Sequence, residues 1–140
     1  MNAPLYTTEI LRLAASLQEP RPLDREDGHA ELRSPTCGSR VTMAVQLDGA
    51  RRVERVSLEV HACAFGQASA ALLEQHAIGR EHNEVAEALL ALSRWLAEEQ
   101  DEVGDWPGLA TLAPARVRKA RHGAILLPFR ALLAAIESAR

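Results

Sequence analysis

The apolar pattern of this chain changes its period once, near Cys63, and this change constrains the fold more than any other feature. Before it, apolar residues alternate with polar or small ones in two runs: Val41, Met43, Val45, Leu47, and then Val56, Leu58, Val60. Such alternation indicates strands with one buried face, and Asp48-Gly49 between the runs predicts a tight turn. A further strand is expected near Ala30 to Ser34. The first part of the chain therefore predicts an antiparallel sheet.

Beyond Cys63 the apolar residues recur at helical spacing. The alanine-rich segment from Ala64 to Ile78 ends before Gly79, and a second helical face is formed by Val85, Ala88, Leu89, Leu92 and Leu96. Phe129 to Ile136 predicts a last helix, with Pro128 in its first turn. At the N-terminus, Ile10, Leu13, Ala14 and Leu17 share one face of a helix that Thr7 can cap.

Strands followed by helices, without strand-helix-strand alternation, predict an α+β fold. We expect a three-stranded antiparallel sheet covered by helices, with an N-terminal helix and a C-terminal helical segment. At 140 residues the chain is short for two cores, so residues 1–140 are expected to form a single domain.

Charge and aromatic content exclude several classes of function. The formal net charge of −3 provides no broad positive field for phosphates, and five aromatic residues are too few for a base-stacking platform, which argues against nucleic acid as a partner. The N-terminus has no secretory pattern, and no run of about 18 apolar residues occurs. These features predict a cytoplasmic protein that does not span a membrane.

Two cysteines and one histidine are the candidate site residues. Cys37 lies in the tight loop Ser34-Pro35-Thr36-Cys37-Gly38, and Cys63 precedes the helix that begins at Ala64, where helix-end amides favour a thiolate. His122 is a third candidate because neutral imidazole binds zinc and iron.

Each of these residues also has a structural interpretation. A lone cysteine is about as often a small buried hydrophobe as a ligand, and His122 could simply be a loop histidine beside Arg116, Arg118, Lys119 and Arg121. His61 stands two residues before Cys63, and we interpret this proximity as incidental.

The two cysteine motifs together resemble those of a known family. Four segments are similar in order and spacing to those of the U-type iron-sulfur cluster scaffold family (IscU, SufU and the N-terminal domain of NifU). They are Ser34-Pro35-Thr36-Cys37-Gly38, Ala62-Cys63-Ala64, Gln67-Ala68-Ser69-Ala70 and Leu127-Pro128-Phe129-Arg130. The family assembles iron-sulfur clusters on three cysteines and an aspartate, and some members bind zinc in the same pocket. The resemblance implies a SufE/NifU-like sandwich, and it implies that Cys37 and Cys63 match the first two cysteines.

The rest of the ligand set departs from the family. Ser39 stands where the family has its aspartate, and ungapped matching of Leu127 to Ile136 puts Ala124 at the third cysteine, one residue from the register of His122. Two thiolates supply half of a four-ligand site. Either His122 and a carboxylate complete the set, or two chains share one metal as a homodimer.

The resemblance implies an iron-sulfur cluster assembly scaffold that binds iron, zinc or a labile Fe-S cluster, or accepts sulfur, through Cys37 and Cys63. Its partners would be a cysteine desulfurase and Fe-S acceptor proteins. The alternative is a degenerate scaffold paralogue that binds a desulfurase or an acceptor as an adaptor or regulator and carries no metal or other cofactor. A thiol enzyme with His122 as base ranks last because the sequence has no oxyanion motif, so the chain is not expected to be an enzyme.

Overall fold

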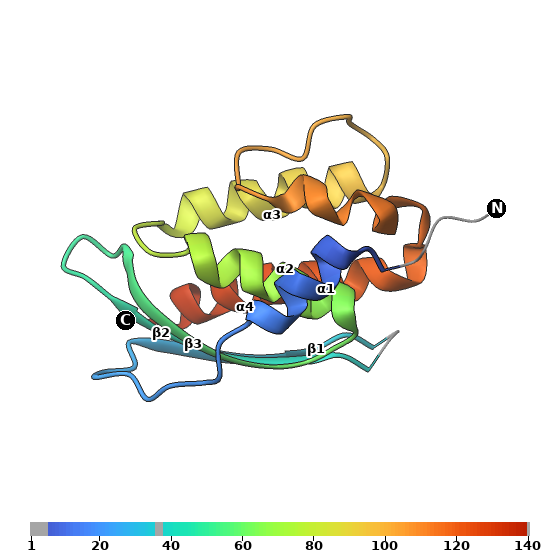
Figure 1. The fold of residues 1–140 in the computed structure, drawn as a ribbon. Coiled ribbons are helices and arrows are strands. Elements are labelled where there is room, and N and C mark those ends of the chain that lie inside the picture. The colour runs from blue at the N-terminus through green and yellow to red at the C-terminus, as the bar shows by residue number, and fades with distance from the viewer. Residues whose placement is uncertain (1–5, 36–37, 140) are drawn as a thin grey trace.

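The computed structural model describes residues 6–35 and 38–139, and these contain a three-stranded antiparallel sheet in the order β1-β2-β3. The strands are β1 (Gly28–Arg33), β2 (Arg40–Leu47) and β3 (Val53–His61). Helices cover one face of the sheet (Figure 1). The predicted α+β class is confirmed.

The strand register explains the alternating apolar pattern. Val41 pairs with Val60 and Met43 with Leu58, so the apolar residues of neighbouring strands share one face. Val41 and Met43 are fully buried and Leu58 is 2% exposed. A shift of one residue would turn this entire set toward solvent, and burial of the face therefore fixes the register.

The helices form two layers above the sheet. α2 (Ala64–His76) and α4 (His122–Ser138) pack on its apolar face, and α1 (Thr8–Ser16) lies beside α2. Between α2 and α4 the chain forms α3 (His82–Leu96) and the 3₁₀ segments η1 (Leu109–Val117) and η2 (Lys119–Arg121), and α3 with η1 lies farthest from the sheet (Figure 1).

The N-terminal helix begins where the sequence predicted. The hydroxyl oxygen of Thr7 accepts a hydrogen bond from the backbone N–H of Ile10 at 3.1 Å, which satisfies one of the unpaired amides of the first turn. Ile10 is fully buried in the common core.

The prediction for the last helix was wrong at its start. α4 begins at His122, and Pro128 lies in its interior instead of in its first turn. A proline there removes a helical hydrogen bond and costs about 3 kcal/mol. Burial of neighbouring residues, Ile125, Phe129 and Leu132 among them at 0% exposure, contributes about 1.5–3 kcal/mol each and outweighs that cost.

The first strand starts two residues earlier than predicted, at Gly28. A Cβ atom at this position would collide with the backbone carbonyl of Ala135 in α4. The backbone N–H of the next residue, His29, donates to Ser138 Oγ at 2.9 Å. The C-terminal end of α4 therefore packs directly against the edge of β1, which only glycine permits.

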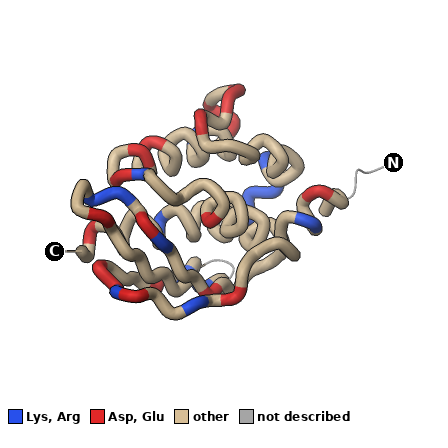
Figure 2. Tube along the Cα trace, turned by 60° about the vertical axis from the view of Figure 1, so that its left-hand side comes forward, with Lys and Arg blue, Asp and Glu red and all other residues tan. Residues whose placement is uncertain are grey.

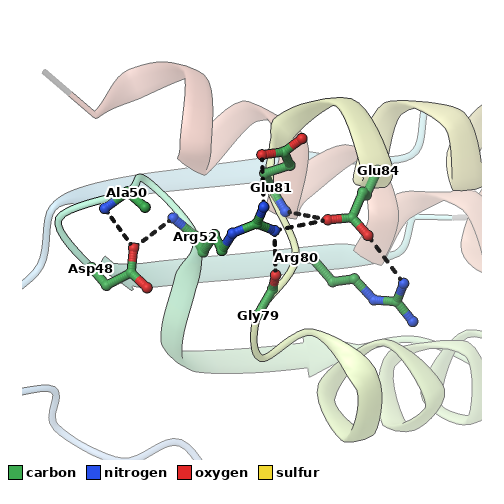
Figure 3. A network of polar contacts seen from close by, with 7 residues as sticks. All are labelled: Asp48, Ala50, Arg52, Gly79, Arg80, Glu81 and Glu84. Carbon is green, nitrogen blue, oxygen red and sulfur yellow. Dashed lines mark hydrogen bonds and ion pairs between the residues drawn. The ribbon is translucent and has the colours of Figure 1, made fainter.

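An ionic network joins the β2–β3 turn to the connection between α2 and α3 (Figure 3). Arg52 donates to the carbonyl of Gly79 at 3.0 Å and forms ion pairs with Glu84 at 3.3 Å and Glu81 at 3.5 Å. Asp48 Oδ1 accepts from the backbone N–H of Arg52 at 3.0 Å. The sheet and the α2–α3 connection are thus tied together at the start of β3.

Charged positions of both signs are interspersed over the molecule, and acidic ones gather in the loop after α3 (Figure 2). This loop carries Glu98, Glu99, Asp101, Glu102 and Asp105. None of the helices in the described part of the chain is long and apolar enough to cross a membrane.

Candidate functional site

Cys63 lies at the junction of β3 and α2, in the N-cap position of the helix. Its backbone is extended, with φ −67° and ψ 173°, and its carbonyl accepts from the N–H of Gln67 at 2.9 Å. The side chain is half-buried and is a free thiol. The amide dipoles at the start of α2 favour a negative charge at this position.

A cavity of about 150 Å³ opens beside this thiol. It is formed by the β1–β2 loop, the β3–α2 junction and the start of α4, and its lining residues are Gly38, Ser39, His61, Ala62, Cys63, Ala120, Arg121 and Ala124. Three segments that are far apart in the sequence therefore meet at Cys63.

Two of the lining residues hold the positions that the resemblance assigned to ligands. Ser39 is 4% exposed and Ala124 is 1% exposed. The loop that ends at Ser39 is closed by a backbone hydrogen bond from Ser34 N to Ser39 O at 2.8 Å. A serine hydroxyl and a methyl group thus occupy the places of a carboxylate and a thiolate around Cys63.

The helices at the back of the cavity are in close contact. A Cβ atom on Gly66 of α2 would lie 2.7 Å from Ala62 Cβ and 3.2 Å from Ala124 Cβ. Ser69 Oγ donates to the carbonyl of Ile125 at 2.6 Å in the same interface. The wall between α2 and α4 is therefore tightly packed and fixes the position of Ala124.

The other two predicted site residues are placed differently. Cys37 lies outside the described residues. His122 does not line the cavity, and its Nε2 faces the backbone carbonyls of Ala115 at 2.8 Å and Arg116 at 3.2 Å. Because carbonyl oxygens only accept, Nε2 of His122 carries the proton and donates to η1. The structure therefore does not bring His122 and Cys63 together in this cavity.

Arg121 is the only lysine or arginine residue of the described lining, which contains no carboxylate. Sequence reasoning treated Arg121 only as part of a basic stretch; its spacing of three residues before Ala124, on one helical face, could have placed it here. His61 pairs with Glu59 at 2.8 Å on the exposed side of β3.

Within residues 6–35 and 38–139, no three His, Cys, Asp or Glu side chains converge as a metal site. A structural zinc site takes four protein ligands, and the described lining of this cavity contributes one thiol, that of Cys63.

Comparisons with known proteins agree with this fold. The model of the NifU-like N-terminal domain family matches residues 5–103. The N-terminal part of a nitrogen-fixing NifU-like protein from Brucella abortus is similar with 32% identity and a TM-score of 0.84, over 96% of this chain and 93% of that one.

A protein of Fervidobacterium islandicum AW-1, described as an iron-sulfur cluster assembly scaffold for the SUF system, shares the fold with a TM-score of 0.84. Its identity is 20%, over 94% of this chain and 96% of that one. No curated protein matches the chain. From the family match and the Brucella relative, the chain belongs to the NifU-like N-terminal domain family, the U-type iron-sulfur cluster scaffolds.

Proposed function

We propose that this chain is an iron-sulfur cluster assembly protein of scaffold type that accepts sulfur at Cys63, with Cys37 as a second thiol. The observation that carries the proposal is the position of Cys63, which lines a small cavity at the N-terminus of α2 beside Arg121. A thiolate in such a place is a nucleophile, and the guanidinium stabilises the anion before and after transfer.

The transfer that this site suits is a thiol-persulfide exchange. Cys63 Sγ, as the thiolate, attacks the outer sulfur of a persulfide on a cysteine desulfurase. The bond between that sulfur and the desulfurase cysteine breaks, and the desulfurase cysteine leaves as a thiolate. One S–S bond forms and one breaks, so the step requires no external oxidant or reductant.

Iron, zinc or a labile Fe-S cluster would be cargo held by Cys37 and Cys63. With Ser39 and Ala124 in the other two family positions, this chain supplies two of the four ligands, and an acceptor protein or a second chain would supply the rest. Such a site favours release of the cargo to acceptors over its storage.

The second candidate is a metal-free adaptor that binds a desulfurase or an acceptor. The absence of a carboxylate from the described lining favours it, because a neutral Ser39 does not attract a cation as an aspartate would. The adaptor function requires that this chain binds its partner protein while Cys63 carries no sulfur.

One experiment separates these functions. The protein is purified anaerobically as wild type, Cys37→Ala and Cys63→Ala and incubated with a cysteine desulfurase and cysteine. It is then analysed by intact mass, for iron, zinc and sulfide, and for binding to the desulfurase. Addition of sulfur to wild type and its loss in Cys63→Ala supports the proposed function. Partner binding without added sulfur or metal in any variant establishes the adaptor instead.

A further inference from the structure

The outer edge of β3 is occupied at its beginning. The backbone N–H of Val53 donates to the carbonyl of Arg80 at 2.8 Å, and the N–H of Gly79 donates to the carbonyl of Val53 at 2.8 Å. The α2–α3 connection thus pairs with the first residue of this edge strand.

A second segment covers the middle of the same edge. Residues 18–22, here called the strap, follow α1 and run across the sheet toward β1 (Figure 1). The backbone N–H of Arg21 donates to Ser57 Oγ at 3.0 Å, and that of Gln18 donates to Glu74 Oε1 at 3.0 Å. The strap therefore crosses β3 near Ser57, and residues 58–61 lie beyond it.

The backbone groups of Leu58 and Val60 point away from the sheet. In an antiparallel pair, the backbone groups of alternate residues point to the neighbouring strand. The hydrogen bond from Ser34 N to Ser39 O fixes this alternation, so the backbone groups of residues 41 and 43 of β2 point to β1. The backbone groups of residues 40 and 42 point to β3, where they pair with residues 61 and 59, and residues 58 and 60 therefore point outward. The same alternation places the N–H of His29 outward on β1, where it meets Ser138.

In the part of the chain that the structure describes, nothing hydrogen-bonds these outward groups of Leu58 and Val60. An edge strand with free N–H and C=O groups is a template for another strand. The last part of β3, next to the functional cavity, is thus open for pairing.

A groove of about 520 Å³ runs along this open edge. It is lined by Ala14, Leu17, Gln18, Glu19, Pro20, Leu58, Glu59, Val60, His61 and Gln67. On the side of the helices the groove is lined by Ala14 and Leu17 of the α1 side and by Gln67 of α2, and the lining contains two carboxylates but neither lysine nor arginine. His61 lines both this groove and the Cys63 cavity, so the two are neighbours on either side of this residue.

We propose that this groove docks an extended segment of the sulfur-donating partner protein, which adds to the sheet as a fourth strand beside β3. The inference rests on the proposed function of Cys63. Residues opposite Leu58 and Val60 would point toward Ala14 and Leu17, and the residue opposite Glu59 would point to the acidic side. The segment therefore alternates apolar and basic residues and leads toward Cys63.

The test uses a seven-residue peptide of alternating lysine and valine, with blocked ends, and amide hydrogen exchange followed by NMR. In the free protein, Leu58 and Val60 should exchange much faster than Ser57 and Glu59. The peptide should slow exchange at Leu58 and Val60 at least about tenfold. Rapid exchange that persists at these two amides with saturating peptide, or protection of both before the peptide is added, overturns the proposal.

Matched variants test the charge. Glu59→Lys should weaken peptide binding roughly fivefold or more, whereas Glu54→Lys, the same change on an exposed residue of β3 outside the groove, should not. A glutamate-valine peptide should bind more weakly, and a peptide with N-methylated valines should not bind. Equal binding of the lysine and glutamate peptides contradicts the inference.

Because the peptide contains no sulfur, Cys63→Ser should bind it as wild type does. If it does and Cys63 never accepts sulfur, the proposed function fails while the docking groove stands. If Cys63 accepts sulfur but the peptide protects neither amide, the docking inference fails alone.

Discussion

At the residue scale, the character of the site depends on Ser39 and Ala124. Both are buried and line the cavity beside Cys63, in places where a carboxylate and a thiolate would complete a tetrahedral metal site. A hydroxyl and a methyl group there do not provide the carboxylate and the thiolate that the resemblance implies, and the described lining keeps one thiol, that of Cys63.

Restoring both residues should convert the site. We expect Ser39→Asp/Ala124→Cys to bind zinc at least about tenfold more tightly than wild type, because two anionic ligands join the thiolate. Competition with a chromophoric chelator measures this affinity. Ser39→Asn/Ala124→Ser, of similar size without the negative charges, is the control, and equal affinity in all three proteins would refute the expectation.

At the element scale, α2 and α4 approach closely beside the cavity, where a Cβ atom on Gly66 would lie 3.2 Å from Ala124 Cβ, and also 2.7 Å from Ala62 Cβ before α2. Gly66→Ala should lower the free energy of unfolding by about 1–3 kcal/mol through overpacking, although alanine has the better helix propensity. Urea unfolding measures the change. Gly49→Ala, where a Cβ meets nothing within 4 Å, is the control, and an unchanged stability of Gly66→Ala would exclude close packing.

A single tryptophan connects the loop after α3 to both inner helices. Trp106 Nε1 donates to the carbonyl of Leu72 in α2 at 3.0 Å, and its ring packs edge-on against Phe129 of α4 at 5.1 Å between centroids. The guanidinium of Arg80 lies 4.7 Å from the ring centroid. Hydrogen bond, aromatic contact and cation–π contact thus hold the loop in place.

These contributions can be separated by two substitutions. Trp106→Phe keeps most of the apolar surface and should cost about 1 kcal/mol for the lost hydrogen bond and reduced ring, whereas Trp106→Ala should cost about 3–5 kcal/mol. Thermal unfolding measured by circular dichroism gives both values. Equal losses would mean that the indole N–H, and not ring packing, dominates.

At the scale of the whole molecule, two polar contacts tie distant parts of the chain and give stability opposite dependences on pH. Hydrogen bonding to Glu137 raises the pKa of His82 above its ordinary value, with a smaller opposing effect of Arg51. The backbone N–H of Leu47, followed by Arg25, lowers the pKa of Asp27. His82 joins α3 to α4, and Asp27 joins the segment before β1 to β2.

The sign of each contribution follows from linkage. His82 stabilises the fold at pH values below the pKa that it has in the unfolded chain, and this stabilisation is lost as the pH rises through its pKa in the folded protein. Asp27 stabilises the fold at pH values above its pKa in the unfolded chain, and this stabilisation is lost as the pH falls through its pKa in the folded protein. His82→Gln should therefore lower the free energy of unfolding more at pH 5 than at pH 8. Asp27→Asn should lower it more at pH 6 than at pH 3. Urea unfolding across this range, with His76→Gln as control, is the measurement, and parallel curves for variant and wild type would contradict the assignment.

Several features could be predicted from the sequence because they depend on local pattern. The alternation at residues 41–47 and 56–60, the helical period after Cys63 and the cap at Thr7 each express a local rule, and the structure has all of them. The two cysteine motifs identified the family for the same reason, since their residues lie in short contiguous segments.

Other features were decided only by the tertiary structure, because they depend on segments that are far apart in the sequence. Packing of α4 against α2 and the sheet carries the helix through Pro128 back to His122, turns that histidine toward η1, and brings Arg121 and Ala124 to Cys63. Among the described residues, the order of the strands and the path of the strap leave the end of β3 open. Local sequence pattern thus sets where the main strands and helices form and where Cys63 stands between them, whereas the packing of these elements sets what surrounds its thiol.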